Sequence, residues 1–154
     1  ELLPQRGAAC RAITRAMRHH PEMVGGSARF DTRLMQAGAG NLICKGGAEG
    51  YFAVGILPGV LAPGSPGIGI TLKIADGAQG QAGSGKPFHG PPEDGDLDHR
   101  GLPVAVLALL RNLGVLTADE MKALAKFDER TTVNWRGLPV GKIRANFTLA
   151  RYAP

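Results

Sequence analysis

The apolar residues of this chain recur with two different spacings, which predict two kinds of secondary structure. Over residues 8–17 they lie three and four positions apart, as on one face of a helix that ends at Pro21. The residues that share this face are Ala9, Ala12, Ile13, Ala16 and Met17. A second, short helix is expected over residues 31–36, where Asp31 would cap the free backbone N–H groups and Gly38 would close the far end.

Three extended segments follow, over residues 41–45, 50–57 and 67–74. A glycine-rich turn separates the first two, which predicts an antiparallel hairpin, and a loop rich in Pro and Gly leads to the third. In the third segment the aliphatic residues alternate with small or polar ones, so Lys73 should point away from the aliphatic face. The three segments therefore predict an antiparallel meander.

The second half of the chain begins with residues 77–101, whose Gly, Pro, Asp and His content predicts a long flexible loop. An apolar helix is expected over residues 102–113, and Gly114 would end it. Thr117 and Glu120 have the spacing of a capping box, which would open another helix reaching about Phe127. Two short extended segments, 131–135 and 140–147, complete the order. We therefore expect a single α+β domain over residues 1–154, an antiparallel β-sheet packed by helices.

Composition and charge narrow the classes of function. The 154 residues are 44% hydrophobic and carry a net charge of +5, with 23 glycines and 11 prolines that indicate many turns. The basic residues are scattered and no aromatic residues are interleaved with them, which argues against nucleic-acid binding despite a pI near 9.6. No apolar run approaches the ~20 residues that cross a bilayer, so no membrane partner is expected.

Cysteine and histidine positions give no metal site. Cys10 and Cys44 have neither metal-ligand spacing nor a disulfide-dense setting, which favours a reducing, cytoplasmic environment. Cys44 should face the opposite side of its strand from Lys45, so we expect a buried thiol there. The adjacent His19 and His20 point in different directions on a helix, and their place near a helix C-terminus accounts for them better than a metal does.

Several stretches resemble the L-asparaginase II family, which is similar in architecture to serine β-lactamases and penicillin-binding proteins. They are residues 16–26 (AMRHHPEMVGG), 29–35 (RFDTRLM), 45–50 (KGGAEG), 72–77 (LKIADG) and 134–137 (NWRG). The resemblance implies hydrolysis of L-asparagine to L-aspartate and ammonia through serine-lysine pairs. It also implies that the α+β fold resembles the C-terminal part of the serine β-lactamase-like fold, and it is compatible with a homodimer.

Lys45 matches the family's lysine that pairs with an active-site serine, and the resemblance makes it the candidate catalytic residue. A lysine in water is a poor base at neutral pH, whereas one in a partly desolvated cleft loses its proton more easily and can activate a serine. Gly46, where penicillin-recognising enzymes often have threonine, and Gly47 would let the amide substrate approach the backbone at the strand edge, whose N–H groups could stabilise a developing oxyanion. Glu49 and Lys73 are further candidates for substrate binding. The alternative is that all of these are solvated strand and turn residues.

The family's Ser-x-x-Lys and Lys-Cys-Ser-Gly-Lys-His type stretches, which resemble its nucleophile and zinc-ligand segments, are not found in this chain. Ser27, Ser65 and Ser84 are its serines, and none has lysine three positions later. We therefore expect the C-terminal half of a longer enzyme, inactive without an N-terminal half, and zinc only through residues not present here. The chain also starts without Met. A noncatalytic protein-interaction domain is the other hypothesis, and a basic nucleic-acid-binding module is a third.

Overall fold

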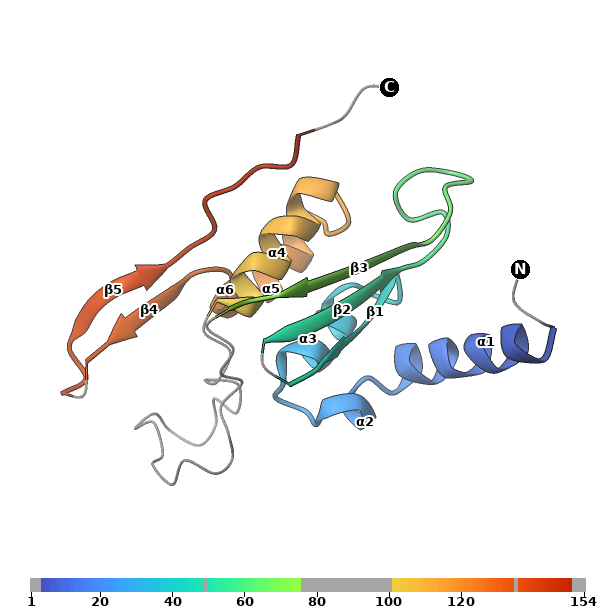
Figure 1. Cartoon of the computed structure of the whole chain (residues 1–154), viewed down its shortest axis with the longest axis horizontal. Coiled ribbons are helices and arrows are strands. Elements are labelled where there is room, and N and C mark those ends of the chain that lie inside the picture. The colour runs from blue at the N-terminus through green and yellow to red at the C-terminus, as the bar shows by residue number, and fades with distance from the viewer. Residues whose placement is uncertain (1–3, 49, 76–100, 135, 151–154) are drawn as a thin grey trace.

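The computed structural model describes residues 4–48, 50–75, 101–134 and 136–150, which form an α+β fold (Figure 1). The helices are α1 (Pro4–His19), α2 (Glu22–Gly25), α3 (Phe30–Ala37), α4 (Leu102–Leu113), α5 (Ala118–Ala123) and α6 (Ala125–Asp128). The strands are β1 (Leu42–Gly46), β2 (Tyr51–Ile56), β3 (Ile68–Lys73), β4 (Arg130–Val133) and β5 (Pro139–Ile143). The predicted loop over residues 77–101 lies outside the described residues, apart from Gly101.

Strands β1, β2 and β3 form the expected antiparallel meander, with β1 and β3 at its edges. Residues paired across the strands point to the same face of the sheet. Cys44, Val54 and Ile70 therefore share one face, and the next row, Lys45, Ala53 and Thr71, shares the other. The first of these faces is buried in β1 and β2, and the second is exposed or partly exposed. Lys73 belongs to the second face, as its strand pattern predicted.

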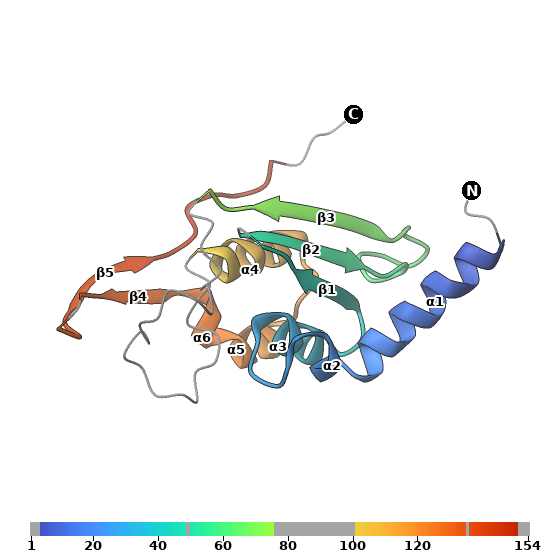
Figure 2. The ribbon, with the colours of Figure 1, turned by 60° about the horizontal axis from the view of Figure 1, so that its bottom comes forward.

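Helices α3 and α4 cover the buried face of the sheet, and Figure 2 shows both on the same side of it. The core joins aliphatic residues of α4, such as Leu107 and Leu110, to Phe52 of β2 and to Leu34 of α3, all of them at most 1% exposed. Burial of this apolar surface supplies most of the driving force for folding. The core therefore fixes α3 against β1, which is the contact that matters for the candidate site.

In the second half of the chain, the predicted helix end at Gly114 and the capping box at Thr117 are confirmed, but the predicted extent of the last helix is not. Helix α4 ends at Gly114, whose left-handed φ of 70° favours glycine, and Thr117 and Glu120 form both bonds of the capping box. The single helix expected up to Phe127 is wrong. The chain instead breaks at Leu124, whose φ of -102° and ψ of 10° depart from the helix, into α5 and α6, and both Leu124 and Phe127 are buried in the core at 1% and 8% exposure.

Two elements extend away from this core at opposite ends of the molecule (Figures 1 and 2). The hairpin of β4 and β5 forms a separate two-stranded sheet, so the last strands do not join the main sheet. Helix α1 is longer than its apolar spacing predicted, and none of its residues is buried. Its predicted apolar face, including Ile13 at 59% exposure, is largely open.

Candidate active site at the end of β1

Lys45 lies one residue from the end of β1, on the exposed face of the sheet. Its side chain is 56% exposed, yet its amine does not extend freely into solvent. The Nζ atom donates a hydrogen bond of 2.5 Å to the carbonyl oxygen of Gly46 and lies 4.0 Å from Oδ2 of Asp31. The residue that the resemblance singles out is thus half accessible and turned back toward the edge of its own strand.

Asp31 is the residue whose role the sequence analysis got wrong. The N-cap of α3 is Arg29, no side chain caps the helix, and Asp31 lies within the first turn at 2% exposure. Its carboxylate points out of the helix toward β1, where Oδ2 accepts a hydrogen bond of 3.3 Å from the Gly46 N–H. Oδ1 accepts one of 3.4 Å from Nε of Arg29. The helix therefore buries this carboxylate beside β1 instead of using it as a cap.

The hydroxyl of Thr32, the residue after Asp31, binds the first turn of α3 to the preceding backbone. Thr32 is fully buried, and its Oγ1 donates to the carbonyl oxygens of Gly26, at 2.7 Å, and of Pro21, at 3.2 Å. These bonds tie the start of α3 to the segment around α2. The start of α3 is therefore bound to the preceding segment through contacts that do not involve the Asp31 carboxylate.

The two glycines after Lys45 have partners for their backbone N–H groups. The Gly46 N–H donates to Asp31, and the Gly47 N–H donates to the carbonyl oxygen of Tyr51 at 2.9 Å. Both donors are therefore engaged within the chain. A Cβ at position 47 would lie 2.8 Å from the Tyr51 ring, so the close approach of Tyr51 gives a structural reason for glycine there.

Lys73 and Glu49 are the two remaining candidates for substrate binding. Lys73 ends β3 on the same exposed face as Lys45, but β2 lies between their strands. Its partner across the strands is Tyr51, at 41% exposure, while Ala53 and Thr71 lie in the row of Lys45. Ala53, Thr71 and Tyr51 thus lie between the two lysines on this face. Glu49 lies outside the described residues.

Cys44 confirms the predicted buried thiol. It is 2% exposed, and its Sγ lies 3.3 Å from the backbone carbonyl oxygen of Asp31, to which the thiol donates. Burial is the main reason that the pKa of this thiol is raised well above its ordinary range, and the nearby Asp31 carboxylate raises it further. A neutral buried thiol is a poor nucleophile, so Cys44 serves packing between β1 and α3.

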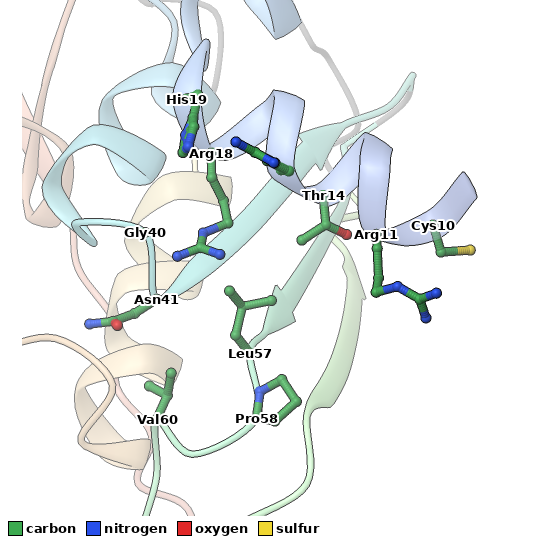
Figure 3. A pocket seen from close by; sticks show the side chains of 11 residues that line it. Cys10, Arg11, Thr14, Arg18, His19, Gly40, Asn41, Leu57, Pro58 and Val60 are labelled. Carbon is green, nitrogen blue, oxygen red and sulfur yellow. The ribbon is translucent and has the colours of Figure 1, made fainter. Parts of the chain in front are cut away.

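A groove beside described residues lies away from Lys45. This open groove, with a cavity volume of ≈ 860 Å³, runs between α1 and the segments next to the start of β1 and the end of β2, and Figure 3 shows the Arg18 guanidinium reaching from α1 into it. Its lining includes Arg11, Arg15 and Arg18, whose spacing along a helix could have revealed a shared face in the sequence. None of the candidate site residues lines the groove, which adjoins Asn41 while Lys45 lies near the far end of β1.

The described residues also bear on metals and membranes. Among them, no three His, Cys, Asp or Glu residues lie close enough together to hold a metal ion. The donor set that zinc requires is therefore not assembled by this part of the chain. Within the described ranges, no helix combines the length and the apolar character needed to span a bilayer.

Comparison with protein families identifies a match to this chain. The family model described as L-asparaginase II matches residues 2–84, a span that includes α1 to β3 and every candidate site residue named above. No curated protein matches the chain.

Proposed function

The chain belongs to the L-asparaginase II family, and we propose that it contributes Lys45 to an enzyme that hydrolyses the side-chain amide of L-asparagine. The products are L-aspartate and ammonia. The observation that carries the proposal is the position of the Lys45 amine, half exposed at the end of an edge strand and held near a buried carboxylate. An amine placed in this way is accessible to a reacting group, while its contacts restrict the conformations of the lysine side chain.

The proposed reaction uses a serine from a segment outside these 154 residues, supplied by an N-terminal half of the same enzyme. The serine oxygen attacks the amide carbon, and Lys45 takes the serine proton and returns it to the departing nitrogen, which leaves as ammonia. Water then hydrolyses the serine ester to L-aspartate and restores the serine.

Gly46 and Gly47 do not supply the donors for the oxyanion in this proposal. Because their N–H groups already donate to Asp31 and Tyr51, other donors would stabilise the oxyanion. Glycine at these positions allows close packing at the end of β1, since Gly46 is buried and a Cβ at Gly47 would lie 2.8 Å from the Tyr51 ring. Lys73, on the same exposed face, is proposed to attract the α-carboxylate of the substrate.

Ammonia release from L-asparagine by the chain combined with the N-terminal half tests the proposal. Lys45→Ala should lower kcat by about 10²–10⁴-fold, the usual contribution of a positioned proton-transfer group. Lys45→Arg should be similarly impaired, because a guanidinium keeps its proton. Lys142→Ala is the matched control, since that exposed lysine pairs with Glu129 on the β4–β5 side of the molecule. Turnover by Lys45→Ala within about threefold of the wild type would exclude Lys45 from the chemistry.

A noncatalytic role in protein association is a second candidate, favoured by the open surface of α1. This helix of 16 residues has no buried residue, and Ile13 is 59% exposed on it. In that case the chain would form a stable complex with a partner, and Lys45→Ala would leave the rate of ammonia release unchanged. Turnover that depends on Lys45 would favour the enzyme instead.

A further inference from the structure

We propose that Asp31 is a positioning residue, which fixes the amine of Lys45 at the end of β1. The proposal rests on the proposed function of Lys45 for its catalytic meaning, whereas the contact itself can be tested without any activity. Three groups converge on the Asp31 carboxylate: the Gly46 N–H, the Arg29 guanidinium and the Lys45 amine. They come from β1 and from the residues that open α3.

A buried carboxylate needs such partners. At 2% exposure Asp31 cannot be solvated, and a buried charge without compensation is strongly destabilising. Its own helix turn provides only Arg29, which is 37% exposed. The other compensating groups belong to β1, so the carboxylate stabilises the fold only when Lys45 and Gly46 are in their observed places.

The contacts around Gly46 form a closed ring. Lys45 Nζ donates to the Gly46 carbonyl oxygen, the Gly46 N–H donates to Asp31 Oδ2, and that same oxygen lies 4.0 Å from Lys45 Nζ. A lysine side chain on an open sheet face otherwise samples many rotamers. The ring therefore defines where the amine lies relative to the backbone of β1. Without the carboxylate, only the bond to the Gly46 carbonyl oxygen would remain.

The first experiment measures how fast Lys45 reacts with a trace of acetic anhydride at constant pH, read by mass spectrometry against Lys142 as an internal reference. Asp31→Asn keeps the shape and an acceptor for Gly46 but removes the negative charge near which the Lys45 amine is held. We expect the rate at Lys45 to rise about two- to fivefold, in keeping with a pair whose lysine is exposed. Arg29→Gln should lower the rate, because Lys45 then remains as the cation nearest to the carboxylate.

Thr32→Val is the matched control for a merely structural effect. It disturbs the same helix turn by removing two hydrogen bonds to the backbone, but it leaves the carboxylate in place. The labelling of Lys45 should then stay at the wild-type rate. Equal rates in the Asp31→Asn variant and the wild type, or equal changes in Asp31→Asn and Thr32→Val, would overturn the proposal. Arg29→Gln keeps the test decisive if Asp31→Asn does not fold.

The second experiment measures asparagine turnover with the N-terminal half present. Loss of positioning should lower kcat by about 10–100-fold in Asp31→Asn, with KM within about twofold, because the misplaced group acts in the chemical step. An unchanged kcat in a folded Asp31→Asn variant would contradict the positioning role. Absence of turnover in the wild type would instead overturn the proposed function, and the labelling rates would still decide whether Asp31 holds Lys45.

Discussion

Replacing Phe30 with alanine should destabilise the chain more than almost any other single change in the N-terminal half of the fold. Phe30 begins α3 at 1% exposure, and its ring lies 5.4 Å from that of Phe52 in β2 and 5.1 Å from that of Phe127 in α6. Truncating a buried phenylalanine costs about 3–5 kcal/mol, from lost transfer free energy and from the cavity left behind. Each lost ring pair is part of that cost, at about 0.5–1.5 kcal/mol.

This cost is large beside the total stability of a domain, about 5–15 kcal/mol. Urea unfolding followed by far-UV circular dichroism measures it directly as a lower midpoint at an unchanged slope. Phe147→Ala is the matched control, because Phe147 is 44% exposed and its truncation should change stability by less than about 0.5 kcal/mol. A loss of under about 1 kcal/mol in Phe30→Ala would refute the view that this ring joins the helices to the sheet.

Three further outcomes follow from the same structure. Ellman's reagent should modify Cys10 in the native chain and Cys44 only after unfolding. Because the pKa of the Cys44 thiol is raised in the folded state, the folded chain keeps this proton at a pH where the unfolded chain loses it. The free energy of unfolding should therefore fall by up to about 1.4 kcal/mol per pH unit above the ordinary thiol pKa of about 8.5, and Cys44→Ala should remove this slope. Equal reactivity of both thiols would contradict this. Gly114→Ala should cost about 1–2 kcal/mol at its left-handed φ, whereas Gly69→Ala, with no atom within 4 Å of the added Cβ, should cost much less in the same thermal unfolding assay. Thr117→Ala should cost about 1 kcal/mol by loss of the capping box, and an unchanged melting temperature would show that α5 does not need it.

Local signals in the sequence determined most of the elements. The meander was predictable because a glycine-rich turn separates the first two extended segments and a loop rich in Pro and Gly leads to the third, in which apolar residues alternate with small or polar ones. The helix ending at Gly114 and the capping box at Thr117 were predictable because a left-handed glycine and a reciprocal pair of hydrogen bonds are properties of a few adjacent residues. The resemblance that singled out Lys45 was also carried by contiguous residues, and the family match agrees with it.

What only the tertiary structure decided was which side chains meet. Asp31 has the residue type of an N-cap near the start of a helix, and nothing within seven residues of it shows that its carboxylate is buried against Gly46, which is 15 positions away. The break at Leu124 was likewise not visible in the capping-box pattern that predicted one helix. That β4 and β5 pair with each other and not with the meander was not visible in either strand's own residues. Local propensity sets the elements because it acts through neighbouring backbone groups, whereas burial and charge pairing act between segments and appear only when the chain has packed.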